Sequence, residues 1–143
     1  MASKFPGLKE HVIVCGFGAV GQKVVDVLTE KGVSFIIIEM DPAVIEKIRE
    51  LGHKAVNGDA TLSKTLRDAS IETAKAIAIV MDNDAKNLFC VLTARDMNKN
   101  LFIATRANDD FVREKLVEAG ADYIVTPQKA ASKEIVRELF KTA

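Results

Sequence analysis

Two hydrophobic patterns alternate along the chain. Short apolar runs bounded by polar or glycine residues predict β-strands, and segments with apolar residues three or four positions apart predict amphipathic helices. The predicted strands cover residues 11–15, 34–39, 54–57, 76–81, 101–105 and 123–125. The predicted helices cover residues 20–31, 42–52, 62–68, 84–97, 109–119 and 132–141. Strands and helices that alternate in this way indicate an α/β protein.

The predicted strand at residues 34–39 is apolar on both faces, which is typical of a buried parallel strand. Asp41 and Pro42 suit the N-cap and the first position of the helix that follows. Parallel strands need crossover connections, which helices provide here, and these connections are right-handed. We therefore predict a Rossmann-type open parallel sheet of six strands with helices on both faces, built from two βαβαβ halves.

The motif GFGAVG at residues 16–21 directly follows the first predicted strand and opens the first predicted helix. In this context Gly16 permits a tight turn, Gly18 lets the backbone approach a pyrophosphate, and Gly21 lets the helix pack close to the strand. The helix N-terminus offers free N–H groups and a partial positive charge to phosphates. The motif predicts a nucleotide site; the simpler alternative is a tight turn made of glycines.

Glu39 ends the second predicted strand, 18 residues after Gly21. An acidic residue at this position accepts hydrogen bonds from the adenosine ribose and repels a 2′-phosphate. No arginine follows in the segment Glu39-Met40-Asp41. We therefore expect NAD(H), or an adenine nucleotide such as ADP or ATP, and not NADP. The alternative for Glu39 is a solvated strand end.

Ligands of open α/β sheets lie outside the carboxyl ends of the strands. Asp59 follows the third predicted strand, where it could contact the adenosine half, while Thr61 could simply cap the next helix. Asp82 and Asp84 follow the fourth strand and could take part in a cation site or cap a helix. Arg106 follows the fifth strand and could pair with a phosphate or with one of these two aspartates.

These positions define the predicted cofactor-binding residues. They are Gly16, Phe17, Gly18, Ala19, Val20, Gly21, Glu39, Met40, Asp59, Ala60, Thr61, Met81, Asp82 and Arg106. Helix capping is the simpler role for the acidic pair after the fourth strand, so we predict no metal site.

Composition narrows the classes of protein. The 143 residues fit one domain, and the formal net charge of +0 argues against a nucleic-acid or membrane-surface binder. The longest apolar run, residues 76–81, is too short to span a membrane, and the N-terminus lacks the apolar core of a signal peptide. We predict a soluble, cytoplasmic chain with a leader or linker at 1–10 and a nucleotide-binding lobe at 11–143.

The sequence offers no obvious catalytic group for the predicted site. His11 and His53 precede strands, at the edge of the sheet opposite the site. Cys15 and Cys90 form no CxxC motif, and Cys15 is expected to pack inertly beneath the glycine loop. A dehydrogenase needs a proton donor or acceptor beside the nicotinamide. We therefore predict a chain that binds a nucleotide and is not an enzyme.

The last predicted helix carries an apolar stripe formed by Ala131, Ile135, Val136, Leu139 and Phe140. One face of this helix is expected to cover the sheet. The stripe is wide enough that part of it could require a partner.

The segments at residues 11–21, 38–42, 57–61 and 118–127 together resemble the RCK (regulator of potassium conductance), KTN or TrkA-N family. The resemblance extends over residues 9–140. It implies a regulatory N-lobe of a prokaryotic potassium channel or transporter, which binds NAD(H), ADP/ATP or AMP and biases the gate through a ligand-induced change in a ring. It also implies a homodimer or octameric gating ring, held at the inner face of the cell membrane by its pore partner.

The resemblance assigns roles to individual residues. Gly16, Gly18 and Gly21 match the phosphate loop, and the remaining matches are Glu39 for the ribose acid, Asp59 for a second adenosine-side acid and Arg106 for a phosphate-side arginine. Calcium-activated members carry glutamates near the end of strand five. Thr105, Ala107 and Asn108 stand there in this chain, which argues against calcium activation.

Two other functions stay open. The domain could serve a Trk/Ktr-type transporter or a Kef-type efflux system, although the leader at residues 5–10 resembles the linker of a channel. Complete family members carry a further C-terminal lobe. A small NAD-dependent oxidoreductase is the alternative from another class.

Overall fold

A computed structural model describes residues 3–141 of the chain and contains one six-stranded sheet. The strands are β1 (Val12–Cys15), β2 (Phe35–Glu39), β3 (Ala55–Asn57), β4 (Ala76–Ile79), β5 (Phe102–Arg106) and β6 (Tyr123–Val125). Their spatial order is β3-β2-β1-β4-β5-β6, and every neighbouring pair is parallel. This order confirms the Rossmann-type prediction, and the strand order reverses between β1 and β4.

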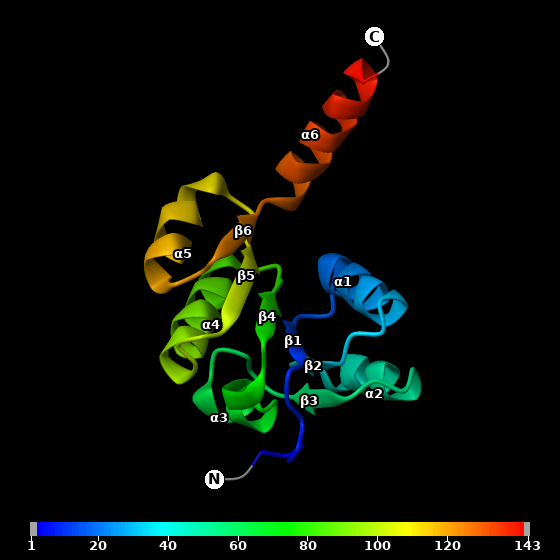
Figure 1. Ribbon diagram of the computed structural model, residues 1–143, viewed down its shortest axis with the longest axis vertical. Helices are drawn as coiled ribbons and strands as arrows, with labels where there is room; N and C mark the ends of the chain where they lie inside the picture. Colours follow the sequence, from blue (N-terminus) through cyan, green and yellow to red (C-terminus); the bar gives the residue numbers. More distant parts are fainter. Residues whose placement is uncertain (1–2, 142–143) are drawn as a thin grey trace.

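Helices cover both faces of the sheet, as predicted. The helices described between residues 3 and 141 are α1 (Ala19–Glu30), α2 (Pro42–Glu50), α3 (Ser63–Asp68), α4 (Asp84–Met97), α5 (Arg113–Ala119) and α6 (Pro127–Phe140), with 3₁₀ turns η1 (Ile71–Thr73) and η2 (Asp110–Val112). Figure 1 shows α1 and α2 on one side of the sheet and α3, α4 and α5 on the other.

The alternation of side chains along β1 divides the core between these two layers. Val12 and Val14 join the cluster that contains residues of α1 and α2, whereas Ile13 and Cys15 join the cluster that contains residues of α3, α4 and α5. All four residues are buried, as expected for the central strand of a sheet covered on both faces.

Several element bounds differ from the sequence prediction. The last helix begins at Pro127 instead of residue 132, because the fixed φ of proline suits a first helical turn and its missing N–H costs nothing there. The helix predicted at 109–119 is divided into η2 and α5. The fourth strand ends at Ile79, and η1 was not predicted. The other bounds match the prediction or differ from it by a residue or two.

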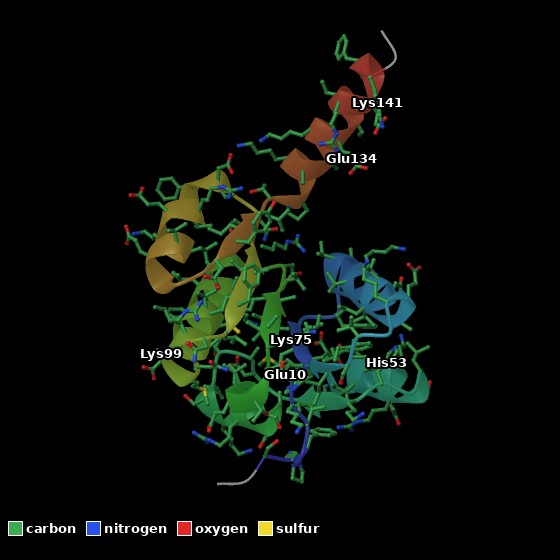
Figure 2. All side chains as sticks on the ribbon, in the orientation of Figure 1. Glu10, His53, Lys75, Lys99, Glu134 and Lys141 are labelled. Carbon is green, nitrogen blue, oxygen red and sulfur yellow. The ribbon has the colours of Figure 1, made fainter. Side chains whose placement is uncertain are left out.

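The expectation that α6 covers the sheet is wrong. A single residue, Thr126, separates β6 from α6, so the helix continues outward instead of turning back over the sheet (Figure 1). All residues of α6 after Pro127 are exposed, and Figure 2 shows Glu134, and Lys141 just after the helix, standing clear of the rest of the molecule. Near the start of the helix, Lys129 Nζ donates to Asp110 Oδ2 of η2 (3.0 Å). The apolar stripe is therefore uncovered, with Leu139 68% and Phe140 72% exposed.

The described part of the predicted leader lies against α3 and η1. The Ser3 hydroxyl donates to the Asp68 carbonyl (3.0 Å), and the Glu10 N–H donates to the Thr73 carbonyl (2.8 Å). Phe5 packs against the core. Residues 1–2 of this leader, and residues 142–143 of the predicted lobe, lie outside the described residues. Between residues 3 and 141, no helix combines the length and the apolar character that a membrane crossing requires.

Candidate functional site

The glycine motif forms the turn from β1 into α1. Gly16 has a φ of +103°, in the left-handed region that favours glycine, and a Cβ on Gly21 would collide with the Gly16 carbonyl. Gly18 differs, because its φ is −82° and a Cβ there would have no described heavy atom within 4 Å. Neither its φ nor the space around it requires glycine at position 18, which is the N-cap of α1.

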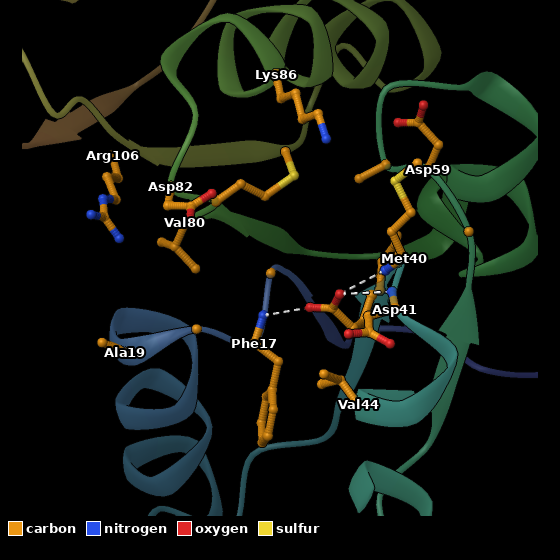
Figure 3. Close-up of a pocket in the computed structure, with 17 residues that line it drawn as sticks. Phe17, Ala19, Met40, Asp41, Val44, Asp59, Val80, Asp82, Lys86 and Arg106 are labelled. Atoms are coloured by element: carbon orange, nitrogen blue, oxygen red, sulfur yellow. Dashed lines mark hydrogen bonds between the residues drawn. The ribbon is translucent and has the colours of Figure 1, made fainter. Parts of the chain in front are cut away.

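A cavity of about 450 Å³ lies beside this turn, at the carboxyl ends of the strands (Figure 3). It brings together 11 of the 14 predicted site residues: Gly16, Phe17, Gly18, Ala19, Glu39, Met40, Asp59, Ala60, Met81, Asp82 and Arg106. Val20, Gly21 and Thr61 do not line it. The lining also includes Ile38, Asp41, Val44, Gly58, Val80 and Lys86, which the sequence analysis did not select.

Glu39 connects two loops at the cavity. Its Oε1 accepts from the Phe17 N–H (3.2 Å), and its Oε2 accepts from the N–H groups of Met40 and Asp41 (both 2.9 Å), as drawn in Figure 3. One lone pair on Oε1 remains for a ligand hydroxyl. The carboxylate thus holds the glycine loop against the β2–α2 loop and keeps a negative charge at the cavity wall.

Asp59 is fixed by its neighbour Thr61. Its Oδ1 accepts from the Thr61 backbone N–H (2.9 Å) and from the Thr61 hydroxyl (2.7 Å). These bonds, together with the nearby charge of Lys86, hold the pKa of Asp59 below its ordinary value. Thr61 does not cap the following helix, since the N-cap of α3 is Leu62. Its function here is to orient Asp59.

Arg106 makes no ion pair with Asp82 or Asp84 in the described structure; its Nε donates instead to Asn108 Oδ1 (2.8 Å). The Asp84 carboxylate accepts from the backbone N–H groups of Asn108 (2.8 Å) and Asp109 (3.2 Å). The remaining guanidinium nitrogens of Arg106 are therefore available at the cavity.

Lys86 is the most consequential residue that sequence reasoning missed. It lies in the first turn of α4, and Figure 3 shows its side chain pointing into the cavity beside Asp59 and above Met40. This position is difficult to predict from the sequence, because a lysine in the first turn of a helix is usually exposed to solvent. With Arg106 it gives the lining two cations, against the carboxylates of Glu39, Asp41, Asp59 and Asp82.

Asn87 fixes the cavity floor and was also missed. It is fully buried; its Oδ1 accepts from the Met81 N–H (3.1 Å), and its Nδ2 donates to the carbonyls of Met81 (2.9 Å) and Arg106 (3.1 Å). One side chain on α4 thereby joins the ends of β4 and β5. This arrangement depends on tertiary contacts that no local pattern encodes.

The residues considered for catalysis lie away from the cavity. His11 is buried, with its Nε2 2.9 Å from the Ala69 carbonyl oxygen, and His53 packs on Phe35. Cys15 is buried with its Sγ 3.9 Å from that of Cys90; this contact and burial raise the pKa of the Cys15 thiol, which keeps it protonated. Within residues 3–141, no group of three or more histidine, cysteine or acidic side chains is arranged to hold a metal ion.

The model of the TrkA-N domain family matches residues 12–127. The chain is 33% identical over 139 residues to potassium channel protein 1 of Methanocaldococcus jannaschii, covering 96% of this chain and 42% of that protein. It is 32% identical over 130 residues to a Trk system potassium uptake protein TrkA homolog of Archaeoglobus fulgidus, covering 89% of this chain and 30% of that protein. The chain thus spans less than half the length of both relatives.

Solved structures share the fold. The TrkA-N domain of the inner membrane protein ybaL from Escherichia coli matches with a TM-score of 0.88 and 25% identity, covering 94% of this chain and 98% of that chain. The GsuK RCK domain matches with a TM-score of 0.70 and 33% identity, covering 81% and 25%. Three further structures share the fold at 20–23% identity. The GsuK channel bound to NAD has a TM-score of 0.79 and covers 87% of this chain and 23% of that chain, and GsuK bound to ADP has a TM-score of 0.78 and covers 87% and 34%. The Shewanella denitrificans Kef CTD in AMP-bound form has a TM-score of 0.78 and covers 92% and 80%.

Proposed function

The chain belongs to the TrkA-N domain family, and from this premise we propose that it is a nucleotide-sensing regulatory lobe that gates a prokaryotic potassium channel. The observation that carries the proposal is the cavity, where the glycine turn, the acid at the end of β2 and an arginine from β5 meet around about 450 Å³. Among the described lining residues there is no histidine, cysteine or tyrosine to serve a dehydrogenase. A site of this kind supports binding more than turnover.

The proposed ligand is NAD(H), with ADP, ATP or AMP as the other adenine nucleotides that fit the same half of the site. Glu39 and Asp41 place negative charge where the adenosine ribose would lie, which disfavours the 2′-phosphate of NADP. Family structures bound to NAD, ADP and AMP support this class of ligand. Ligand binding would bias the gate by favouring one of two conformations of the assembly.

The test is a calorimetric titration of the 143-residue chain with NAD, ADP, ATP, AMP and NADP. We expect NAD or an adenine nucleotide to bind at least about tenfold more tightly than NADP, a factor that corresponds to about 1.4 kcal/mol. Glu39→Gln should reduce this discrimination, while Glu50→Gln, an exposed acid at the end of α2, should leave it unchanged. Equal affinity of the wild-type chain for NAD and NADP would remove the role given to Glu39.

Lys86 offers a second test of the same site. Its ammonium group points into the cavity, so Lys86→Met should weaken the binding of ADP more than that of adenosine. Lys115→Met changes an exposed lysine on α5 in the same way and serves as the matched control. Equal losses for ADP and adenosine would show that Lys86 does not recognise phosphate.

The proposed partners are a second copy of this chain, in a homodimer or octameric gating ring, and a membrane pore that holds the lobe at the inner face of the cell membrane. No nucleic acid and no membrane insertion of this chain are involved. A Trk/Ktr-type transporter or a Kef-type efflux system is the second candidate for the pore, supported by the TrkA homolog of Archaeoglobus fulgidus among the relatives. Two pore helices upstream of the lobe in the full-length protein would favour the channel.

An oxidoreductase stays the alternative class, and robust hydride transfer from simple alcohols or hydroxy acids to NAD would overturn the regulatory proposal.

A further inference from the structure

Arg106 is placed between two cavities and held by one neighbour. It lines the large cavity, and together with Asn108 it lines a second one of about 280 Å³ that is bounded by Thr126, Pro127 and Gln128. A long arginine side chain at such a position has many rotamers available. The orientation of the guanidinium group therefore depends on which of its N–H groups already donates a hydrogen bond to the protein.

Asn108 engages one guanidinium nitrogen and leaves the others. Its Oδ1 accepts from Arg106 Nε at 2.8 Å, while its Nδ2 donates to the Asp82 carbonyl at 2.9 Å. The second bond fixes which side of the amide faces the arginine, because an NH₂ group cannot accept from Nε. In the part of the chain that the structure describes, no protein acceptor lies within hydrogen-bonding distance of the two terminal nitrogens of Arg106.

Side chains of α4 hold the backbone of both Asn108 and Arg106. The Asn108 backbone N–H donates to Asp84 Oδ1 (2.8 Å), and Asn87 Nδ2 donates to the Arg106 carbonyl (3.1 Å). Both residues of the pair thus have a fixed backbone, and the contact between their side chains joins the segment after β4 to the segment after β5.

We propose that Asn108 is a positioning residue, which holds Arg106 so that its two terminal nitrogens are presented to the phosphate of a nucleotide. This inference rests on the proposed function, since it assigns a role within the same site. Arginine recognises phosphate through paired N–H groups in a planar fork, and the binding geometry is lost if the fork rotates. The Asn108 amide carries no net charge, so it orients the guanidinium without offsetting its positive charge. A carboxylate at this position would offset that charge.

The experiment compares ADP with adenosine, which lacks the phosphates, on four forms of the 143-residue chain: wild type, Asn108→Ala, Arg106→Ala and the double variant. We expect Asn108→Ala to weaken ADP about tenfold, the size of one charge-assisted contact, and to leave adenosine unchanged. In the Arg106→Ala background, Asn108→Ala should have no further effect on ADP. Asn108→Asp should weaken ADP as well, because its carboxylate offsets the guanidinium charge.

Asn100→Ala provides the matched control, since Asn100 is exposed and precedes β5 at the opposite end of that strand. Thermal unfolding of each variant shows whether the fold is kept. Equal losses for ADP and adenosine in Asn108→Ala, or additive losses in the double variant, would overturn the positioning role while leaving the proposed function intact. A wild-type chain that binds none of the adenine nucleotides would overturn both.

Discussion

At the scale of single residues, Asn87 shows how a buried polar side chain can shape the proposed binding site although it does not line the cavity. Its three hydrogen bonds satisfy the N–H and carbonyl of Met81 and the carbonyl of Arg106. Removing it leaves three part-buried backbone groups without partners, and an unsatisfied buried group costs about 1–3 kcal/mol. Asn87→Ala should therefore lower the free energy of unfolding by about 3 kcal/mol, measured by urea denaturation. Asn100→Ala, an exposed change, should stay within about 0.5 kcal/mol of wild type, and an equally small effect at Asn87 would contradict this account.

Asp59 provides a residue-scale prediction about pH. Hydrogen bonds from Thr61 lower the pKa of Asp59 from its ordinary value of 3.8, so its ionised form is favoured by folding. The resulting stability is fully present above the unfolded pKa and is lost as the pH falls through the lower, folded pKa. The stability difference between wild type and Asp59→Asn should thus be constant near pH 7 and close below about pH 3.8. Urea titrations between pH 7 and pH 2.5 measure it, and a difference that does not change with pH would refute the assignment.

At the scale of elements, the exposed stripe of α6 predicts self-association. Ile135, Leu139 and Phe140 are 61%, 68% and 72% exposed on a helix that no other described element covers. Leu139→Asp should shift the chain from dimer to monomer in light scattering, because it puts a charge into the proposed interface. Leu51→Asp is the matched control, since Leu51 is 65% exposed at the end of α2. A wild-type chain that is monomeric at high concentration would rule out this interface.

The strands, the glycine turn and α6 show which parts of the fold and of the candidate site could be predicted from the sequence. The strands, the glycine turn and the positions of Glu39 and Asp59 were predictable, because local patterns place them at the carboxyl ends of a parallel sheet. The direction of α6 could not be predicted. An apolar stripe indicates that a helix face is suited to packing, but it does not indicate which surface packs against that face. The roles proposed for Lys86 and Asn108 could not be predicted, because they depend on contacts between segments that are distant in sequence.

At the scale of the whole molecule, the candidate site lies close to the first residues of the projecting helix α6, because Arg106 lines both the large cavity and the second cavity at the start of α6. Thr126 is the N-cap of α6 and, with Pro127 and Gln128, lines the second cavity beside Arg106. A ligand that contacts Arg106 therefore lies near the base of the helix proposed to bind a second copy. Two sites connected in this way are expected to influence each other, and any such coupling is reciprocal.

This reciprocity gives a quantitative prediction. A nucleotide that binds only the folded chain stabilises it by about 2.7 kcal/mol at a concentration of 100 times its Kd, which should raise the melting temperature by about 10 °C. If the α6 interface is coupled to the site, the factor by which saturating ADP changes the dimer dissociation constant must equal the square of the factor by which dimerisation changes the ADP affinity of each site, because a dimer binds two ADP molecules. Sedimentation with and without ADP gives the first factor, and ADP titrations of wild type and Leu139→Asp give the second. Two factors equal to one would mean that the lobe binds its ligand without transmitting the event through α6, and gating would then have to proceed through another surface.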